Sequence, residues 1–193
     1  EIPAYIGLTV VLCNCVQKNA MVRETPFTRI DSLTEQYLEL QDSMLHAWNV
    51  MIKDDNYKLL TMSNLLDELK KSGQHDEQLL DSLDLRLNKL KFMRYNQKTI
   101  INTRIISHYD FVTGSLTDHL ASLAAQESPN THLQELINEI RLANKRVNTY
   151  RNNYDAVVIR YNKFLEANKD ILKEIDARLS ADKKPLFHMA SGN

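Results

Sequence analysis

Glycine and proline are scarce in this chain, with only 4 of each among its 193 residues. Proteins built from many short strands need more of both for their turns, so an all-β fold is disfavoured. The formal net charge of −1 gives no basic surplus for a nucleic acid, which we therefore do not expect as a partner. Cysteine is confined to Cys13 and Cys15, so the rest of the sequence has no disulfide framework and no thiolate metal site.

What the chain does contain is a set of apolar residues spaced alternately three and four apart. The longest such stripe runs from Leu133 to Leu179, and neither glycine nor proline occurs between Thr131 and Leu179. The spacing predicts an amphipathic helix of about 70 Å at about 1.5 Å per residue. A helix of that length can bury its apolar face only against other long helices.

Another long helix is predicted nearer the N-terminus. Ser32 and Glu35 have the spacing of a capping box, and apolar residues at helical intervals follow them. Lys70 and Lys71 are basic, and Gly73 follows them after Ser72. This arrangement is typical of a helix C-terminus. We therefore expect this helix to run between the capping box and Gly73.

The region between these two helices also has a helical period, but its centre, residues 94–98, is polar. Gly114 lies within the region, and glycine costs about 1 kcal/mol relative to alanine in a helix interior. We therefore expect two helices, over 76–108 and 110–125, with one bent helix as the alternative. Ser128-Pro129-Asn130 predicts a turn into the last helix.

The connections at 72–75 and 126–130 are short, and short connections make successive helices antiparallel. The expected fold class is therefore all-α: an elongated antiparallel up-and-down bundle of three to four long helices. Burial of each Leu, Ile or Val side chain contributes about 1.5–3 kcal/mol, so the apolar stripes are the main source of stability.

The chain divides into four segments on this basis. Residues 1–16 form an apolar N-terminal segment, 17–31 a polar linker, 32–187 the helical bundle and 188–193 a C-terminal tail. The first segment carries no charge after Glu1, but it is short for a membrane span, which needs about 20 residues. It is the end of a transmembrane anchor, the hydrophobic part of a signal peptide, or an element packed on the bundle.

We favour the first two interpretations of the N-terminal segment, which place the protein at the membrane in the cell envelope. Of the two possible sides of the membrane, we slightly favour a bundle that lies outside the cytoplasm. Lipid modification of Cys13 or Cys15 is a further alternative that fits poorly. The residues before them, Leu12 and Asn14, are not small, whereas a small residue normally precedes a lipidated cysteine.

Several short motifs resemble those of the LemA family of bacterial membrane-associated helical proteins. In the last helix they are Arg146-Val147, Arg151-x-x-Tyr154-Asp155-Ala156-Val157 and Tyr161-Asn162. The others are Ala47-Trp48, Asn64-Leu65-Leu66, His75-Asp76 and, near the chain end, Lys184-Pro185-Leu186-Phe187. The motifs occur in the same order as in the family, and the resemblance covers residues 32–187.

The chain departs from the family pattern at three places. Tyr57-Lys58 stands where the family has a basic pair, Ser63 replaces a proline, and the linker separates the apolar segment from the first helix. The last departure favours an exported or separately anchored form. The resemblance implies a helical bundle associated with the cell envelope, and it implies no mechanism, because the family has no established catalytic activity.

The last helix carries the candidate interaction surface. Its tyrosines and arginines are residue types enriched at binding hot spots, and the candidates are Tyr150, Arg151, Tyr154, Tyr161 and Arg146. In the alternative interpretation the rings fill the core and the arginine stems pack beside them. The same helix has several asparagines, which indicate hydrogen bonds to a neighbouring element: Asn148, Asn152, Asn153 and Asn162.

Sequence motifs for catalysis or metal binding are missing. A di-iron bundle needs Glu-x-x-His, whereas His132-x-x-Glu135 has the reverse order, and His108 is expected to be a partly buried histidine with a structural partner. The sequence also lacks Gly-x-Ser-x-Gly and a glycine-rich phosphate loop. We therefore expect no enzyme activity, no catalytic or metal-binding residues and no cofactor.

The sequence thus favours a non-catalytic, envelope-associated bundle that binds or scaffolds other proteins. The alternative is a ligand-sensing bundle, in which the polar stretches 53–56 and 94–98 face each other and line a pocket between helices. A metal-dependent enzyme is a third hypothesis, and it would need carboxylates and histidines that converge in the core.

Overall fold

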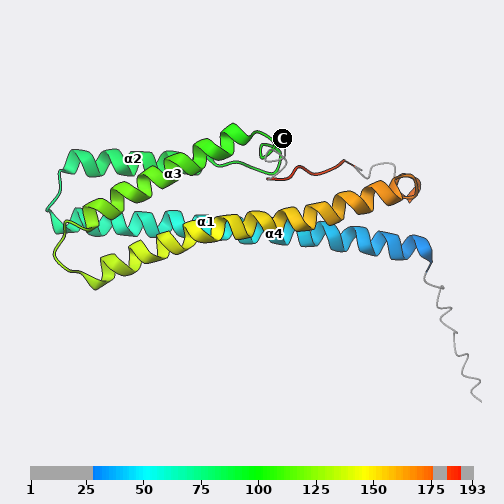
Figure 1. Ribbon diagram of the computed structural model, residues 1–193, viewed down its shortest axis with the longest axis horizontal. Helices are drawn as coiled ribbons and strands as arrows, with labels where there is room; N and C mark the ends of the chain where they lie inside the picture. The colour runs from blue at the N-terminus through cyan, green and yellow to red at the C-terminus, as the bar shows by residue number, and fades with distance from the viewer. Residues whose placement is uncertain (1–27, 176–181, 188–193) are drawn as a thin grey trace, which may run out of the picture.

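The computed structural model describes residues 28–175 and 182–187, and four helices account for most of them (Figure 1). They are α1 (Arg29–Ser72), α2 (Glu77–Met93), α3 (Thr103–Ala124) and α4 (Thr131–Ile175). The described part of the chain contains no strand. The expected all-α, up-and-down bundle is therefore confirmed, with four helices.

The apolar N-terminal segment, the linker up to residue 27 and the tail 188–193 lie outside the described residues. The same holds for residues 176–181, which include the end of the predicted apolar stripe. Of the helices in the described ranges, none has an apolar stretch long enough to cross a membrane.

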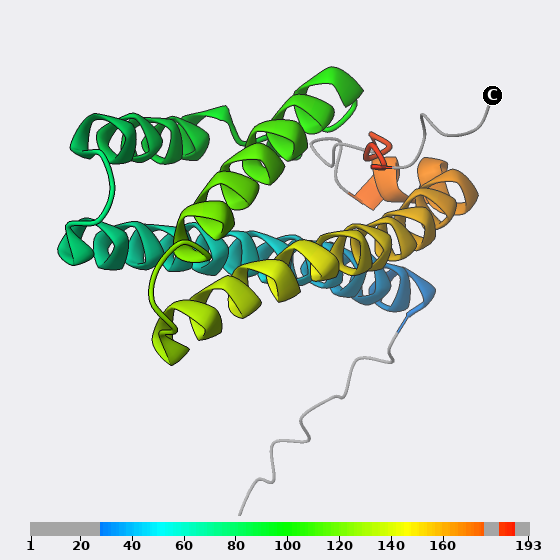
Figure 2. The ribbon, with the colours of Figure 1, turned by 60° about the vertical axis from the view of Figure 1, so that its left-hand side comes forward.

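The long helices α1 and α4 form an antiparallel pair that extends over the length of the molecule (Figure 1). The helices α2 and α3 form an antiparallel hairpin over one half of this pair, the half with the end of α1 and the start of α4 (Figure 2). We call this the four-helix half and the remainder of the α1–α4 pair the two-helix half.

The main core fills the four-helix half and continues past the junction as far as Met44 and Val158. Its most deeply buried side chains include Met62, Leu66, Leu69, Leu83, Leu87, Leu116, Leu120 and Ile140. A smaller cluster lies farther along the two-helix half and consists of Tyr37, Tyr161, Leu165 and Leu172. Within each helix these positions recur at intervals of three, four or seven residues, so the sequence pattern predicts which face is buried.

The helix α1 begins earlier than the sequence pattern predicts. Its N-cap is Thr28, whose hydroxyl accepts a hydrogen bond from the Asp31 N–H at 3.2 Å, while the Thr28 N–H donates to the Asp31 carboxylate at 2.8 Å. The predicted capping box of Ser32 and Glu35 is therefore wrong, because the reciprocal pair forms one turn earlier. The predicted end is confirmed, since Gly73 caps α1 in the left-handed conformation with a φ of 64°.

The break in the middle region falls at residues 94–102, where the chain turns from α2 to α3. The Asn96 side chain accepts hydrogen bonds there from two backbone N–H groups, and the Asn102 side chain caps the start of α3. Asparagine side chains that bind the backbone in this way compete with helix formation.

The predicted helices over 76–108 and 110–125 therefore have the wrong boundary, and the alternative of one bent helix is also wrong. The polar centre of the region breaks the helix, and its glycine does not. Gly114 lies inside α3, and no neighbouring atom lies within 4 Å of the position that a Cβ would take there.

Candidate functional site

Residues 182–187 run back along α4 as an extended segment and reach the junction between the two halves (Figure 1). We call residues 184–187 the C-terminal segment. The side chains that hold it form the segment-binding surface: Trp48 of α1, Tyr95 of the α2–α3 connection, and Arg151, Tyr154, Asp155 and Asn162 of α4. The α4 members are spaced three, four and eleven residues from the first, which places them on one face of the helix.

Two side chains of α4 bind the backbone of the C-terminal segment. The Asn162 amide accepts a hydrogen bond from the Lys184 N–H at 2.8 Å and donates one to the Lys184 carbonyl at 2.9 Å. The Asp155 carboxylate accepts a hydrogen bond from the Phe187 N–H at 2.8 Å. None of these bonds involves a side chain of the segment, so α4 recognises an extended backbone much as a neighbouring strand does.

The Phe187 side chain fills a box of aromatic rings and is only 6% exposed. Trp48 stacks on it with the ring centroids 6.2 Å apart and the planes 13° apart, and Tyr95 and Tyr154 meet it edge-on at 5.4 and 5.6 Å. The Arg151 guanidinium lies 5.3 Å from the ring centroid. Aromatic pairs of this kind contribute about 0.5–1.5 kcal/mol each beyond the area they bury.

Arg151 holds the aromatic box in place. It donates to both carboxylate oxygens of Asp110 at 2.8 Å and to the Tyr95 hydroxyl at 3.1 Å. Burial disfavours its charged form, but the hydrogen bonds with Asp110 and Tyr95 outweigh burial and raise the pKa of Arg151 above its ordinary value. The guanidinium therefore stays charged, and it orients its neighbours without exchanging a proton.

The tyrosines of the box are equally unsuited to proton transfer. Burial raises the pKa of Tyr154 to about 12, with a further contribution from the Asp155 carboxylate. Burial also raises the pKa of Tyr95. With raised pKa values, both hydroxyls remain protonated at neutral pH. A general base works best with a pKa near the ambient pH, so these hydroxyls act as structural groups.

A second polar cluster joins α1 to the α2–α3 hairpin. The Asp55 carboxylate lies 2.9 Å from Nε of Arg94 and 3.0 Å from Nζ of Lys58, and it accepts a hydrogen bond from the Tyr109 hydroxyl at 2.6 Å. The polar stretches of α1 and of the hairpin connection therefore face each other, as the sensing hypothesis requires. Their own side chains occupy the space between them.

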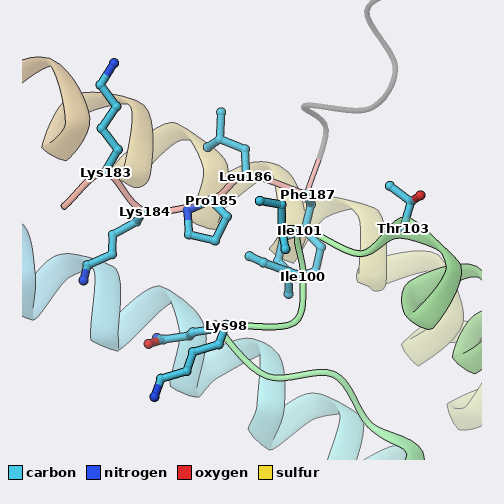
Figure 3. A pocket seen from close by; sticks show the side chains of 10 residues that line it. Lys98, Ile100, Ile101, Thr103, Lys183, Lys184, Pro185, Leu186 and Phe187 are labelled. Carbon is cyan, nitrogen blue, oxygen red and sulfur yellow. The ribbon is translucent and has the colours of Figure 1, made fainter.

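A cavity of about 670 Å³ lies between the C-terminal segment and the α2–α3 connection (Figure 3). The connection contributes Ile100 and Ile101 to its wall, the start of α3 contributes Thr103, and the segment contributes Pro185 and Leu186. The wall is mostly apolar, and it borders the box that holds the Phe187 ring.

The structure separates the five residues predicted for interaction. Three of them are buried: Arg151, Tyr154 and Tyr161 have 6%, 1% and 0% of their surface exposed. They agree with the alternative interpretation, in which the rings fill the core and the arginine stems pack beside them. Tyr150 and Arg146 are half-buried, and Arg146 binds a carboxylate of α1 at 2.7 Å. The five side chains do not form one accessible surface, but two of them support the C-terminal segment from inside the molecule.

The histidines considered as ligands lie apart from these clusters. His108 is exposed and not partly buried, because it lies on the outer side of α3, and His132 and Glu135 are exposed at the start of α4. No three His, Cys, Asp or Glu side chains in the described ranges come together in a way that could hold a metal ion. Both cysteines lie outside those ranges.

Sequence reasoning missed the roles of Asn162, Asp155 and Tyr95. The excess of asparagines in the last helix was a partial signal, since Asn162 does bond to a neighbouring element, but nothing in the sequence identifies that element as the C-terminal segment. Comparison of the chain with models of known protein families, with curated proteins and with solved structures gives no match in any of the three.

Proposed function

We propose that this chain is a non-catalytic helical bundle of the LemA type that binds or scaffolds other proteins at the cell envelope. The segment-binding surface is then one place where it takes an extended peptide. The observation that carries the proposal is the way the chain holds its own residues 184–187, with Asn162 and Asp155 on the backbone and an aromatic box around one ring. Peptide-recognition domains combine the same two elements, main-chain hydrogen bonds for affinity and side-chain pockets for specificity.

The C-terminal segment acts in this proposal as a tethered competitor. Tethering gives a segment an effective concentration of about millimolar, so a free peptide displaces it only when the peptide binds more tightly or the tethered segment is weakened. The expected partner carries an extended stretch with the chemistry of Lys184-Pro185-Leu186-Phe187: a proline, an apolar residue and then a phenylalanine.

The residues behind the LemA resemblance support this choice of site. Of the motif residues, Arg151, Tyr154 and Asp155 lie on the segment-binding surface, and Asn162 binds the terminal motif that ends in Phe187. Motifs that are far apart in the sequence thus serve one binding arrangement. A shared arrangement gives a physical reason for these residue types to occur together.

The envelope part of the proposal rests on the uncharged stretch 2–16. After a high-salt wash, which weakens charge-dependent contacts with lipid, we expect the full chain to sediment with membranes and a chain that begins at residue 28 to remain in the supernatant. Protease digestion of intact cells then tests the preferred placement of the bundle outside the cytoplasm. A full chain found only in the supernatant would contradict the envelope assignment and leave the peptide site unaffected.

The cavity beside the C-terminal segment favours ligand sensing as the second candidate function. Its volume is within the usual range for small-molecule sites, and its wall is mostly apolar. A ligand there would contact both the segment and the α2–α3 connection, and it could shift one against the other. Native mass spectrometry of the purified chain would reveal such a ligand.

The test of peptide binding uses the full chain with Phe187→Ala, which empties the aromatic box, and a synthetic peptide of residues 182–190. Trp48 is the single tryptophan and stacks on the Phe187 ring, so its fluorescence reports occupancy of the box. We expect a saturable change on titration, with binding to the unmodified chain weaker by about tenfold or more because its own segment competes.

Two controls match this experiment. The same peptide with alanine in place of its phenylalanine should not bind, and Phe92→Ala, at a position that is 90% exposed, should behave like the unmodified chain. A Phe187→Ala chain with unchanged helicity and no saturable binding would overturn the peptide site.

If Phe187→Ala fails to fold, amide hydrogen exchange of the unmodified chain decides the matter. Exchange of the Phe187 N–H through local opening, faster than exchange of the Leu66 N–H, supports a segment that can leave its surface. Equal protection of the two amides would show that the segment separates only on global unfolding, and this would contradict the proposal.

A further inference from the structure

Basic residues gather where α2 ends and α3 begins. Between residues 86 and 109 the chain has six lysines and arginines and no aspartate or glutamate: Arg86, Lys89, Lys91, Arg94, Lys98 and Arg104. The first part of α2 has the opposite character, with Glu77, Asp81 and Asp84. A chain of net charge −1 therefore separates its charges along the α2–α3 hairpin.

Four of these cations are free of carboxylate partners. Lys89, Lys91, Lys98 and Arg104 are exposed, and none of them forms an ion pair within the described part of the chain. Arg94 differs, because it is bound to Asp55. The four exposed cations are thus available to an external anion.

Of the three most exposed large apolar side chains of the described residues, two lie between these cations in the sequence and the third lies seven residues after Arg104. Phe92 is 90% exposed, Ile101 is 76% exposed and Phe111 is 72% exposed. Phe92 and Phe111 each follow a buried residue by two positions, which places them on the outer side of their helices. Lys89 precedes Phe92 by three residues and Arg104 precedes Phe111 by seven, so each cation shares a helix face with a ring.

We propose that this end of the α2–α3 hairpin docks on a lipid surface that contains anionic headgroups. We call it the basic–aromatic tip, formed by Lys89, Lys91, Phe92, Lys98, Ile101, Arg104 and Phe111. Its cations attract the headgroups, and its apolar side chains enter the boundary between headgroups and acyl chains. Anionic headgroups repel the acidic first part of α2, so the hairpin is oriented with the α2–α3 connection toward the lipid.

The composition of the tip favours lipid over a protein partner. Protein interfaces are depleted of lysine and gather their apolar residues into a central dry patch. Here three apolar side chains are interspersed with three lysines and an arginine, and the one carboxylate between residues 86 and 111, that of Asp110, is bound by Arg151. A fluid anionic surface can match such a pattern without a fixed complementary shape. The tip shares no residue with the segment-binding surface, and its Lys98 and Ile101 also line the cavity beside the C-terminal segment.

The test places a fluorescent reporter at the tip of the full chain. Phe92→Trp is mixed with vesicles of brominated phosphatidylcholine, with or without brominated phosphatidylserine, and the tip indole is followed by its quenching. The unmodified chain gives the baseline of Trp48. We expect quenching in the anionic vesicles, little in the neutral ones, and loss of quenching at high salt. A reporter at the tip responds to local docking whether or not the N-terminal segment also binds the vesicles.

Charge variants supply the matched control. Changing Lys89, Lys91, Lys98 and Arg104 to Gln should lower partitioning of the tip by about a hundredfold or more, since each cation near an anionic surface contributes about fivefold. The control changes four exposed lysines elsewhere to Gln and alters the net charge equally: Lys53, Lys145, Lys163 and Lys169. It should leave quenching at the tip close to that of the parent.

Three results would overturn the proposal. They are no quenching in anionic vesicles, equal quenching in neutral and anionic vesicles, and equal losses in the tip and control variants. A different result would assign the tip to an acidic protein partner in place of lipid. In that case the parent chain binds polyglutamate, the tip variant does not, and vesicles quench neither.

Discussion

The two halves of the molecule contain the same pair of long helices, α1 and α4, but the pair is covered differently in each half. In the four-helix half, the hairpin covers the pair, and side chains such as Met62 and Leu69 are 0% exposed. In the two-helix half, the rings of Tyr37 and Tyr161 lie 6.0 Å apart and fill the seam between α1 and α4. Large rings suit a seam that two helices enclose alone, because each ring buries more area than an aliphatic side chain.

The boundary between the halves explains where the C-terminal segment binds. The hairpin contacts α1 at Asp55, through Arg94 and Tyr109, and Trp48 lies two turns away in the direction of the two-helix half. Phe187 covers Trp48 at the place where the hairpin ends. The segment therefore supplies apolar cover that the hairpin is too short to give.

Leucine truncations should separate the two halves most clearly. Leu66 and Leu165 are 1% and 2% exposed, so they match in burial. We expect Leu66→Ala to lower the free energy of unfolding by about 4 kcal/mol, because four helices hold the cavity open. Leu165→Ala should cost about 2 kcal/mol, because two helices can close on the space. Urea unfolding measures both, and a larger loss at Leu165 would refute this comparison of the halves.

Removal of Arg151 tests the junction between the halves. Truncation of one partner in a buried ion pair costs about 3–5 kcal/mol, but the Asp110 side chain is 43% exposed and water can hydrate it. We therefore expect Arg151→Ala to cost about 2–3 kcal/mol and to change Trp48 fluorescence through the loosened box.

Two further variants sharpen the test of Arg151. Arg151→Lys should not restore stability, since an ammonium group cannot bind both Asp110 oxygens and Tyr95 in the same geometry. Arg146→Ala, which removes a half-exposed ion pair with Asp54, should cost less than about 1 kcal/mol. Equal losses for Arg151→Ala and Arg146→Ala would contradict the special place of Arg151 at the junction.

The sequence predicted the parts of the fold that depend on local periodicity. The apolar stripe of α4 and the cap at Gly73 follow from spacing and backbone preference alone, and both are confirmed. The break at 94–102 was misplaced because the hydrogen bonds of Asn96 decide it, and the polar stretch that contains Asn96 carries a weaker signal than a glycine in a helical pattern.

The candidate site was less predictable, because it depends on contacts between distant parts of the chain. Tyr154 and Tyr161 have the spacing of core residues and the chemistry of hot-spot residues, and only packing decides between the two interpretations. The contact of Phe187 with Trp48 joins residues at opposite ends of the bundle's sequence. Periodicity contains no information about such a contact.

The two described glycines should respond oppositely to the same substitution. Gly73→Ala forces a side chain into the left-handed conformation and should destabilise the protein by about 1 kcal/mol. Gly114→Ala adds a methyl group with no neighbouring atom within 4 Å in a helix interior, and it should stabilise by up to about 1 kcal/mol. Thermal unfolding measures both shifts, and shifts of the same sign would contradict these assignments.

The smallest effect at neutral pH should come from two buried tyrosines, Tyr154 at the junction and Tyr161 in the two-helix half. Burial raises the pKa of each to about 12, whereas an unfolded tyrosine ionises near its ordinary value of about 10. Below about pH 10 both states are protonated, and stability does not depend on these groups. Between about pH 10 and 12 only the unfolded state loses the proton, so stability falls by about 1.4 kcal/mol per pH unit for each group.

Tyr154→Phe and Tyr161→Phe should each remove part of this alkaline loss while changing stability at pH 7 by less than about 0.5 kcal/mol. Urea unfolding at a series of pH values measures the slope for each variant. A slope reduced by Tyr154→Phe but not by Tyr161→Phe would mean that water reaches the tyrosine pair of the two-helix half. That half would then have no dry interior, and the contrast between the halves would be one of hydration as well as of helix number.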